Sequence, residues 1–133
     1  MFRRHRAQPT LQGRNGPSVD HWLINNTFLE LTLTDTHLDD GRWIERPPGF
    51  IPMGWTACWA SESTSFLVGT EGIAHYQTSA GTVTLYWNNP VFGSNDFRCT
   101  VPRGYKCVRR PDAPAPGAGG AVVLPVFEIR FDF

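Results

Sequence analysis

The sequence lacks an excess of charge of either sign, because twelve Lys and Arg side chains balance twelve Asp and Glu side chains. A protein without net charge has no long-range field to attract nucleic acid or an anionic membrane. We therefore expect no nucleic-acid partner. Any ligand has to be recognised by a local arrangement of side chains.

Long hydrophobic runs are also missing. No apolar stretch approaches the roughly 20 residues that a membrane-spanning helix needs. Residues 1–10 contain no apolar core of the kind found in signal peptides. These absences predict a chain without a leader, located in the cytoplasm or secreted by a route that uses no signal peptide.

Cysteine is scarce, and it occurs only as Cys58, Cys99 and Cys107. An odd number without the spacing of a zinc site argues against a disulfide framework and against a structural metal. The sequence favours reduced thiols and predicts neither a metal nor another cofactor. A single bridge between Cys99 and Cys107 stays open if residues 102–104 turn the chain back on itself.

No stretch of a dozen residues shows sustained helical periodicity. Alternating apolar and polar residues, 13 glycines and 11 prolines are instead typical of short strands joined by turns. With 133 residues, the chain predicts an all-β, single-domain antiparallel β-sandwich. We expect this domain at residues 18–133, with a flexible basic arm at 1–17 and a Pro/Gly/Ala-rich loop at 110–120.

The clearest local signal is a β-hairpin within residues 69–97. Residues 73–77 and 82–87 alternate as strands do, and residues 78–81 form a short connection that contains glycine. The second strand should turn Val83, Leu85 and Trp87 toward the core, because strand side chains alternate between two faces.

Further strands are expected on both sides of this hairpin. Residues 22–33 predict two strand segments, or one bent strand around Asn25 and Asn26, and residues 56–59 predict a buried strand before a polar turn at 61–65. Residues 97–101 alternate before an exposed segment at 103–106. The final strand should close the sandwich with one apolar face, formed by Val123, Phe127, Ile129, Phe131 and Phe133.

Prolines at positions 47, 48 and 52 predict a loop or sheet edge at residues 45–52. Four aromatic residues flank or lie within this segment: Trp43, Phe50, Trp55 and Trp59. An irregular surface rich in aromatic rings suits a lipid or a glycan, although any one of these rings can equally belong to the core.

Three short motifs, in order, resemble those of the aegerolysin family. They are Ala-Cys at 57–58, Gly-Thr-Glu-Gly at 69–72, and a run at 86–94 that keeps Tyr, Trp, Pro, Gly and Ser. Asn88 and Asn89 stand where the family has Asp and Cys, and Val91 is an apparent insertion. The resemblance covers about the middle third of the chain and implies an aegerolysin- or actinoporin-like sandwich.

This resemblance implies a monomer or weak dimer that binds membrane sphingolipids peripherally. It also implies that the protein can be the binding component of a two-component cytolysin with a pore-forming partner protein. The expected lipid-binding residues are Glu71, Trp87, Phe92, Trp43, Trp55, Trp59, Asn88 and Asn89. Glu71→Ala is expected to abolish binding, because its carboxylate would meet the cationic amine of a headgroup.

Two other classes of function remain open. The same Trp and Asn side chains suit a carbohydrate-binding lectin, and the domain can also be a purely structural sandwich. An enzyme is not expected, since the candidate acids and bases are scattered through turns and strands. These candidates are Glu71, His75, Asp96, His21 and His37.

Overall fold

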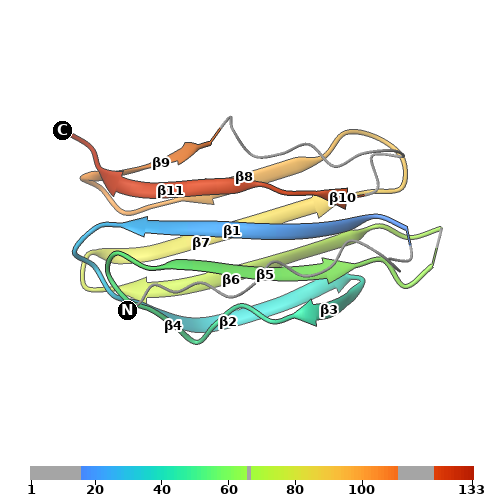
Figure 1. Ribbon diagram of the computed structural model, residues 1–133, viewed down its shortest axis with the longest axis horizontal. Coiled ribbons are helices and arrows are strands. Elements are labelled where there is room, and N and C mark those ends of the chain that lie inside the picture. The colour runs from blue at the N-terminus through green and yellow to red at the C-terminus, as the bar shows by residue number, and fades with distance from the viewer. Residues whose placement is uncertain (1–15, 66, 111–121) are drawn as a thin grey trace.

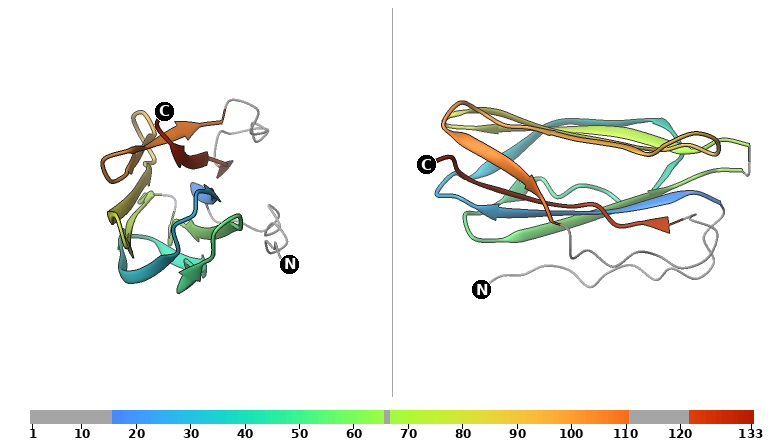
Figure 2. Two further views of the ribbon diagram at one scale, coloured as in Figure 1. Left: turned by 90° about the vertical axis from the view of Figure 1, so that its left-hand side faces the viewer. Right: turned by 90° about the horizontal axis from the view of Figure 1, so that it is seen from above.

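Every regular element of the described chain is a β-strand. The structure is a computed structural model that describes residues 16–65, 67–110 and 122–133. Its strands form two sheets packed face to face, seen along their length in Figure 1 and from the end in Figure 2. The predicted all-β sandwich is confirmed. The predicted arm and loop lie outside the described residues, apart from Gly16, Pro17 and Arg110.

The first sheet has the strand order β3-β5-β1-β11-β9, and the second has the order β4-β2-β6-β7-β8. The strands of the first sheet are β1 (Ser18–Asn26), β3 (Arg42–Glu45), β5 (Thr56–Glu62), β9 (Tyr105–Arg109) and β11 (Val126–Phe131), with β10 (Val122–Val123) also paired to β1. The strands of the second sheet are β2 (Leu31–Asp40), β4 (Phe50–Ile51), β6 (Thr70–Thr78), β7 (Gly81–Asn89) and β8 (Asp96–Thr100).

The sheets are antiparallel except where β1 meets its two parallel neighbours. β1 runs parallel to β10 and β11, with Leu23 opposite Phe127. Pro125 interrupts the later strand because it has no N–H, but its carbonyl accepts a 2.9 Å hydrogen bond from the Trp22 N–H. The other strand pairs of both sheets are antiparallel. Local alternation does not encode which distant strands become neighbours, so this pairing was not visible in the sequence.

β6 and β7 form the predicted hairpin, and both strands extend further than the sequence suggested. Thr78 pairs with Gly81, so that Ser79 and Ala80 make the connection. The longer strands also contain Glu71, Asn88 and Asn89, which lie outside the predicted strands at 73–77 and 82–87. This extension fixes the positions of several candidate site residues.

The core face of β7 is confirmed, because Val83, Leu85 and Trp87 are all fully buried. Gly72 lies opposite Trp87 in the hairpin register. A Cβ at Gly72 would lie 2.5 Å from Cζ2 of Trp87, which is too close for any side chain. The second glycine of the Gly-Thr-Glu-Gly motif is therefore needed for packing against the indole.

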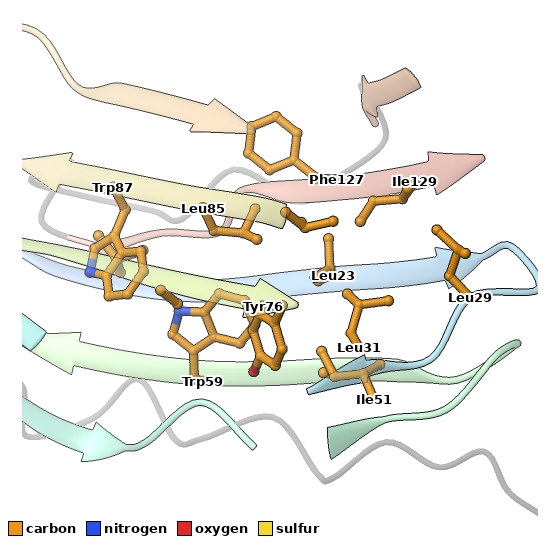
Figure 3. Close-up of a cluster of buried hydrophobic side chains, with 14 residues drawn as sticks. Leu23, Leu29, Leu31, Ile51, Trp59, Tyr76, Leu85, Trp87, Phe127 and Ile129 are labelled. Carbon is orange, nitrogen blue, oxygen red and sulfur yellow. The ribbon is translucent and has the colours of Figure 1, made fainter. Parts of the chain in front are cut away.

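The core divides along the length of the sandwich, as Figure 3 shows. One half is mainly aliphatic and includes Leu29, Leu31, Ile51 and Ile129. The other half is aromatic and contains polar atoms. There the indole N–H of Trp87 donates to Ser61 Oγ at 3.2 Å, so this large ring is buried without losing its hydrogen bond.

A disulfide connects the two sheets at one edge. Cys99 of β8 is bonded to Cys107 of β9, with their Cα atoms 6.1 Å apart. The favoured prediction of reduced thiols is wrong for this pair, because the chain does turn back at residues 102–104 and brings β9 beside β11. Cys58 is a free, buried cysteine.

The first alternative for residues 22–33, two strand segments, is confirmed, because β1 ends at Asn26 and β2 begins at Leu31 in the other sheet. Two further strand predictions need correction. The polar turn expected at 61–65 starts later, since β5 continues through Glu62. The apolar face of the last strand leaves the core at its end, where Phe131 and Phe133 are exposed.

Candidate functional site

Three of the residues expected to bind lipid are buried in the interior. Trp59 stacks on His21, with ring centroids 4.4 Å apart, and Trp87 lies in the core described above. Asn89 is buried and its Nδ2 donates to the carbonyl of Ser18 at 3.0 Å. These side chains hold the two sheets together, so the prediction that they contact a ligand at the surface is wrong.

Glu71, Asn88 and Phe92 lie together at one end of the sandwich, which we call the Phe92 end. Glu71 and Asn88 are opposite each other in the hairpin register. Phe92 is 85% exposed in the loop between β7 and β8. The Glu71 carboxylate accepts a hydrogen bond from the hydroxyl of Tyr86. Burial raises the pKa of Tyr86 to about 12, and the Glu71 carboxylate adds to this rise.

Trp55 does not join that group, and Trp43 packs toward the core. Trp43 is half-buried, 6.0 Å from the ring of Trp87, with the Arg46 guanidinium 5.3 Å above its own ring. Trp55 lines a cleft of about 280 Å³ together with Phe50 and the proline loop. The carbonyl of Trp55 accepts a hydrogen bond from Asn25, near the opposite end of the sandwich. The tertiary structure thus separates the predicted site residues.

That opposite end carries an aromatic cluster that the sequence did not reveal. The Phe28 cluster consists of Phe28, Tyr105, Phe131 and Phe133. The ring of Phe131 lies 5.0 Å from Tyr105, 6.5 Å from Phe28 and 5.8 Å from Phe133. Phe28 is 78% exposed and Phe131 is 38% exposed. We call this the Phe28 end.

The cluster forms because several strand ends meet there. Phe28 lies in the connection from β1 to β2, Tyr105 is the first residue of β9, and Phe131 is the last residue of β11. Tyr105 is also the register partner of Phe131, which explains their stacked rings. In Figure 1 the ends of β1 and β11 and the start of β9 lie on the same side of the molecule.

Two basic side chains stand beside the aromatic rings. Lys106 and Arg130 line a cleft of about 380 Å³ together with Asn26, Phe28 and Phe131. The Lys106 ammonium is 3.9 Å from the Asp132 carboxylate, at the limit of an ion pair. Phe28 also borders a shallow trough with Met53, which is itself exposed. The Phe28 end therefore combines apolar rings, hollows and positive charge.

Part of this cluster could have been anticipated. The alternation in residues 28–33 assigns Phe28 to the face opposite Leu29 and Leu31, which already indicates exposure. Phe131 follows the apolar alternation of a core strand, so the sequence places it inside. The ring of Phe131 is exposed because Phe131 is the last residue of β11, at the end of the sandwich.

The possible acids and bases do not converge on a catalytic arrangement. His75 Nδ1 is 3.0 Å from Thr84 Oγ1, and His37 lies between Asp35 and Asp39 on the surface. His21 is buried, and desolvation lowers its pKa to about 3, with a further contribution from Arg109. Within residues 16–65, 67–110 and 122–133, no group of three or more His, Cys, Asp or Glu side chains could hold a metal ion. The same residues include no helix suited to crossing a membrane.

Comparison with known proteins supports the fold. No known protein-family model matches the sequence. An uncharacterized protein of Dictyostelium discoideum is 37% identical over 84 residues, covering 61% of this chain, but the match spans only 8% of that protein.

Two crystal structures share the architecture at low sequence identity. RahU, solved in complex with a TRIS molecule, superposes with a TM-score of 0.67 at 12% identity, over 88% of this chain and 96% of its own. Nakanori, described as a lipid binding protein, superposes with a TM-score of 0.64 at 12% identity, over 86% of this chain and 71% of its own. The resemblance to aegerolysins is thus confirmed at the level of the fold.

Proposed function

We propose that this protein binds membrane lipids peripherally and that the Phe28 end is the surface that contacts the bilayer. The single observation that carries the proposal is the gathering of exposed aromatic rings beside two cations. Aromatic rings favour the boundary between headgroups and acyl chains, where one edge of the ring is apolar and the other is wet. Basic side chains favour the adjoining phosphate layer.

The energetics favour this end over a single inserted side chain. Burial of apolar surface contributes roughly 25 cal/mol per Å², and aromatic side chains bury on the order of 150 to 250 Å² each when fully enclosed. Phe28, Phe131 and Phe133 expose much of that area to water. Partial insertion of several neighbouring rings can offset the free-energy cost of immobilising the protein on a surface.

The Phe92 end offers less to a membrane. Among the described residues at this end, the large exposed hydrophobic side chains are Phe92 and Leu67, and Glu71 already accepts a hydrogen bond from Tyr86. The Tyr86 hydroxyl therefore occupies one oxygen of that carboxylate and leaves the other for a headgroup amine. The role of Glu71 as a headgroup contact stays a prediction, and the Phe28 end is the site that we propose in its place.

Sphingolipid is the lipid class that we propose, because the motifs at 57–58, 69–72 and 86–94 resemble those of aegerolysins. The solved structure of Nakanori, a lipid binding protein, has the same fold and supports a binding role rather than catalysis. We further propose that the protein binds without permeabilising the bilayer. In a cytolytic system it would be the binding component, and a partner protein would form the pore.

Vesicle co-sedimentation tests this function. The panel contains phosphatidylcholine alone, sphingomyelin with sterol, and ceramide phosphoethanolamine. We expect binding to one or both sphingolipid vesicles and no release of an enclosed dye. Absence of binding to every vesicle in the panel would overturn the proposal. If glycan arrays were positive in that case, the protein would be a lectin.

A further inference from the structure

A row of polar side chains crosses three neighbouring strands at the Phe28 end. Asn26 of β1 is the register partner of Arg130 of β11, and Arg130 is the register partner of Lys106 of β9. Register partners point to the same face of a sheet, and neighbouring strands are about 4.8 Å apart. Ile129, the neighbour of Arg130, is buried in the core. The row therefore lies on the outer face of the first sheet.

The carboxylate nearest to this row, that of Glu128, is already paired. Glu128 is largely buried, and its two oxygens accept hydrogen bonds from Asn26 Nδ2 at 2.8 Å and from Arg110 NH1 at 3.2 Å. Arg110 thus compensates the charge of Glu128, and Glu128 fixes the orientation of the Asn26 amide. An amide nitrogen carries two N–H groups, so Asn26 keeps one for another acceptor.

The charge of Arg130 is not compensated in the same way. Within the part of the chain that the structure describes, Arg130 forms no salt bridge, while Lys106 has only the 3.9 Å contact with Asp132. Two cations and one exposed carboxylate give this row a local positive charge in a chain whose formal net charge is zero. An anion is the ligand that such a row complements.

We propose that the row formed by Asn26, Lys106 and Arg130 binds the phosphate group of a lipid headgroup. A guanidinium presents a planar fork of donors that matches two phosphate oxygens, and an ammonium adds a point charge. The Asn26 amide supplies a neutral donor. This inference rests on the proposed membrane-binding function, because the row and the Phe28 cluster line the same cleft.

The sequence spacing also suits a bilayer. Arg130 and Phe131 are adjacent in β11, so their Cα atoms are separated by about 3.8 Å along the chain. Their side chains point to opposite faces of the strand end. A bilayer places its phosphates directly above the acyl boundary. One strand end can therefore supply Arg130 for the phosphates and Phe131 for the acyl boundary.

The test compares Arg130→Gln with a matched control, Arg98→Gln. Arg98 is also well exposed, but it lies on β8 of the other sheet and is paired with Asp96 at 2.7 Å. Affinity is measured on sphingomyelin and sterol vesicles, and on phosphate-free vesicles of digalactosyldiacylglycerol. Because a charge-assisted hydrogen bond is lost, R130Q should weaken binding to the phosphate-containing vesicles about tenfold to a hundredfold. R98Q should bind like the unmodified protein.

Phosphate-free vesicles separate this inference from the proposed function. If they bind the unmodified protein through the aromatic rings, R130Q should bind them equally well. Unchanged binding of R130Q to both kinds of vesicle would overturn the phosphate site and leave the membrane function intact. Arg130→Lys keeps the charge and should recover only part of the affinity, because it lacks the planar fork.

Free phosphate is the second source of the same chemistry. Titration with inorganic phosphate, followed by NMR of the arginine side chains, should shift Arg130 and leave Arg98 unchanged. If phosphate shifts Arg130 but no vesicle binds the protein, the site serves a soluble phosphate and the membrane proposal is overturned. No shift of Arg130, together with unchanged vesicle binding by R130Q, would remove the phosphate site altogether.

Discussion

The two ends of the sandwich differ in how their chemistry is arranged. At the Phe92 end, the exposed ring of Phe92 stands in a loop, and the Glu71 carboxylate is bonded to Tyr86. At the Phe28 end, the ring of Phe131 packs against those of Phe28, Tyr105 and Phe133 beside Lys106 and Arg130. The family-like motifs at 69–72 and 86–94 lie at or near the first end. The Ala-Cys motif at 57–58 lies beside Trp55, toward the second end, where the aromatic cluster is gathered.

This difference teaches that recognisable motifs can serve the scaffold. Gly72 makes room for the Trp87 indole, and the indole N–H of Trp87 donates to Ser61 Oγ in the other sheet. The family-like residues therefore explain why the sandwich packs as it does. In the Phe28 cluster, Tyr105 packs against the hydrophobic core, whereas Phe28, Phe131 and Phe133 are exposed. Exposed apolar area without a structural role is a stronger indication of a binding surface.

The largest expected effect is a loss of stability on truncating Trp87, whose ring belongs to the core between the two ends. Trp87→Ala should lower the free energy of unfolding by about 3 to 5 kcal/mol, because a fully buried indole leaves a large cavity. Urea denaturation measures this. Phe92→Ala is the control and should change stability by less than about 0.5 kcal/mol, since the ring is exposed. A Trp87→Ala protein of normal stability would return Trp87 to the list of surface contacts.

Acid should act through His21 in the aromatic half of the core. Its pKa is about 3 in the folded state and about 6.5 when unfolded, so the unfolded chain binds the extra proton between these values. The stability that neutral His21 provides is present above pH 6.5 and falls by about 1.4 kcal/mol per pH unit down to pH 3.

Stability curves of His21→Phe and of the unmodified protein isolate this contribution, since both contain the same carboxylates. As pH falls, the free energy of unfolding of the unmodified protein should fall relative to that of His21→Phe, so that any advantage of the unmodified protein shrinks or reverses. His37→Phe is the control, because His37 lies on the surface and its substitution leaves the core unchanged. Identical acid profiles for all three proteins would mean that His21 is not buried in its neutral form.

The comparison of the two ends is sharpened directly by Phe28→Ser and Phe92→Ser. Both side chains are phenylalanines in exposed connections, so neither substitution should affect folding. Phe28→Ser should weaken binding to sphingolipid vesicles about tenfold, which corresponds to about 1.4 kcal/mol. Phe92→Ser should have little effect. The reverse result would place the membrane surface at the Phe92 end.

The smallest expected change concerns Glu71. Glu71→Ala should lower the pKa of Tyr86 from about 12 toward 10, although burial keeps part of the shift. Tyrosine absorbance across alkaline pH measures this change. A raised tyrosine pKa stabilises the fold below pH 10, and this contribution is lost as pH rises through about 12.

The same variant decides between the two placements of the site. Contact between Glu71 and a headgroup predicts that Glu71→Ala abolishes vesicle binding. If the Phe28 end is the membrane surface, Glu71→Ala should retain vesicle binding while the pKa of Tyr86 falls. Loss of vesicle binding in a folded Glu71→Ala protein would favour the sequence-based site.

The sequence by itself determined the class of the fold and its central hairpin. Alternation is a local property, so it correctly assigned Val83, Leu85 and Trp87 to the core. The positions of glycine and proline correctly indicated most connections, because these residues limit backbone geometry wherever the chain goes.

Only the tertiary structure decided which distant segments meet. The parallel pairing of β1 with β11 and the Cys99–Cys107 bridge depend on contacts between residues remote in sequence or in separate sheets. The Phe28 cluster has the same origin, since its rings come from the ends of strands and a loop. Alternation tells which face a side chain takes, but not where the sandwich ends. The place where the sandwich ends therefore decided which aromatic rings are exposed.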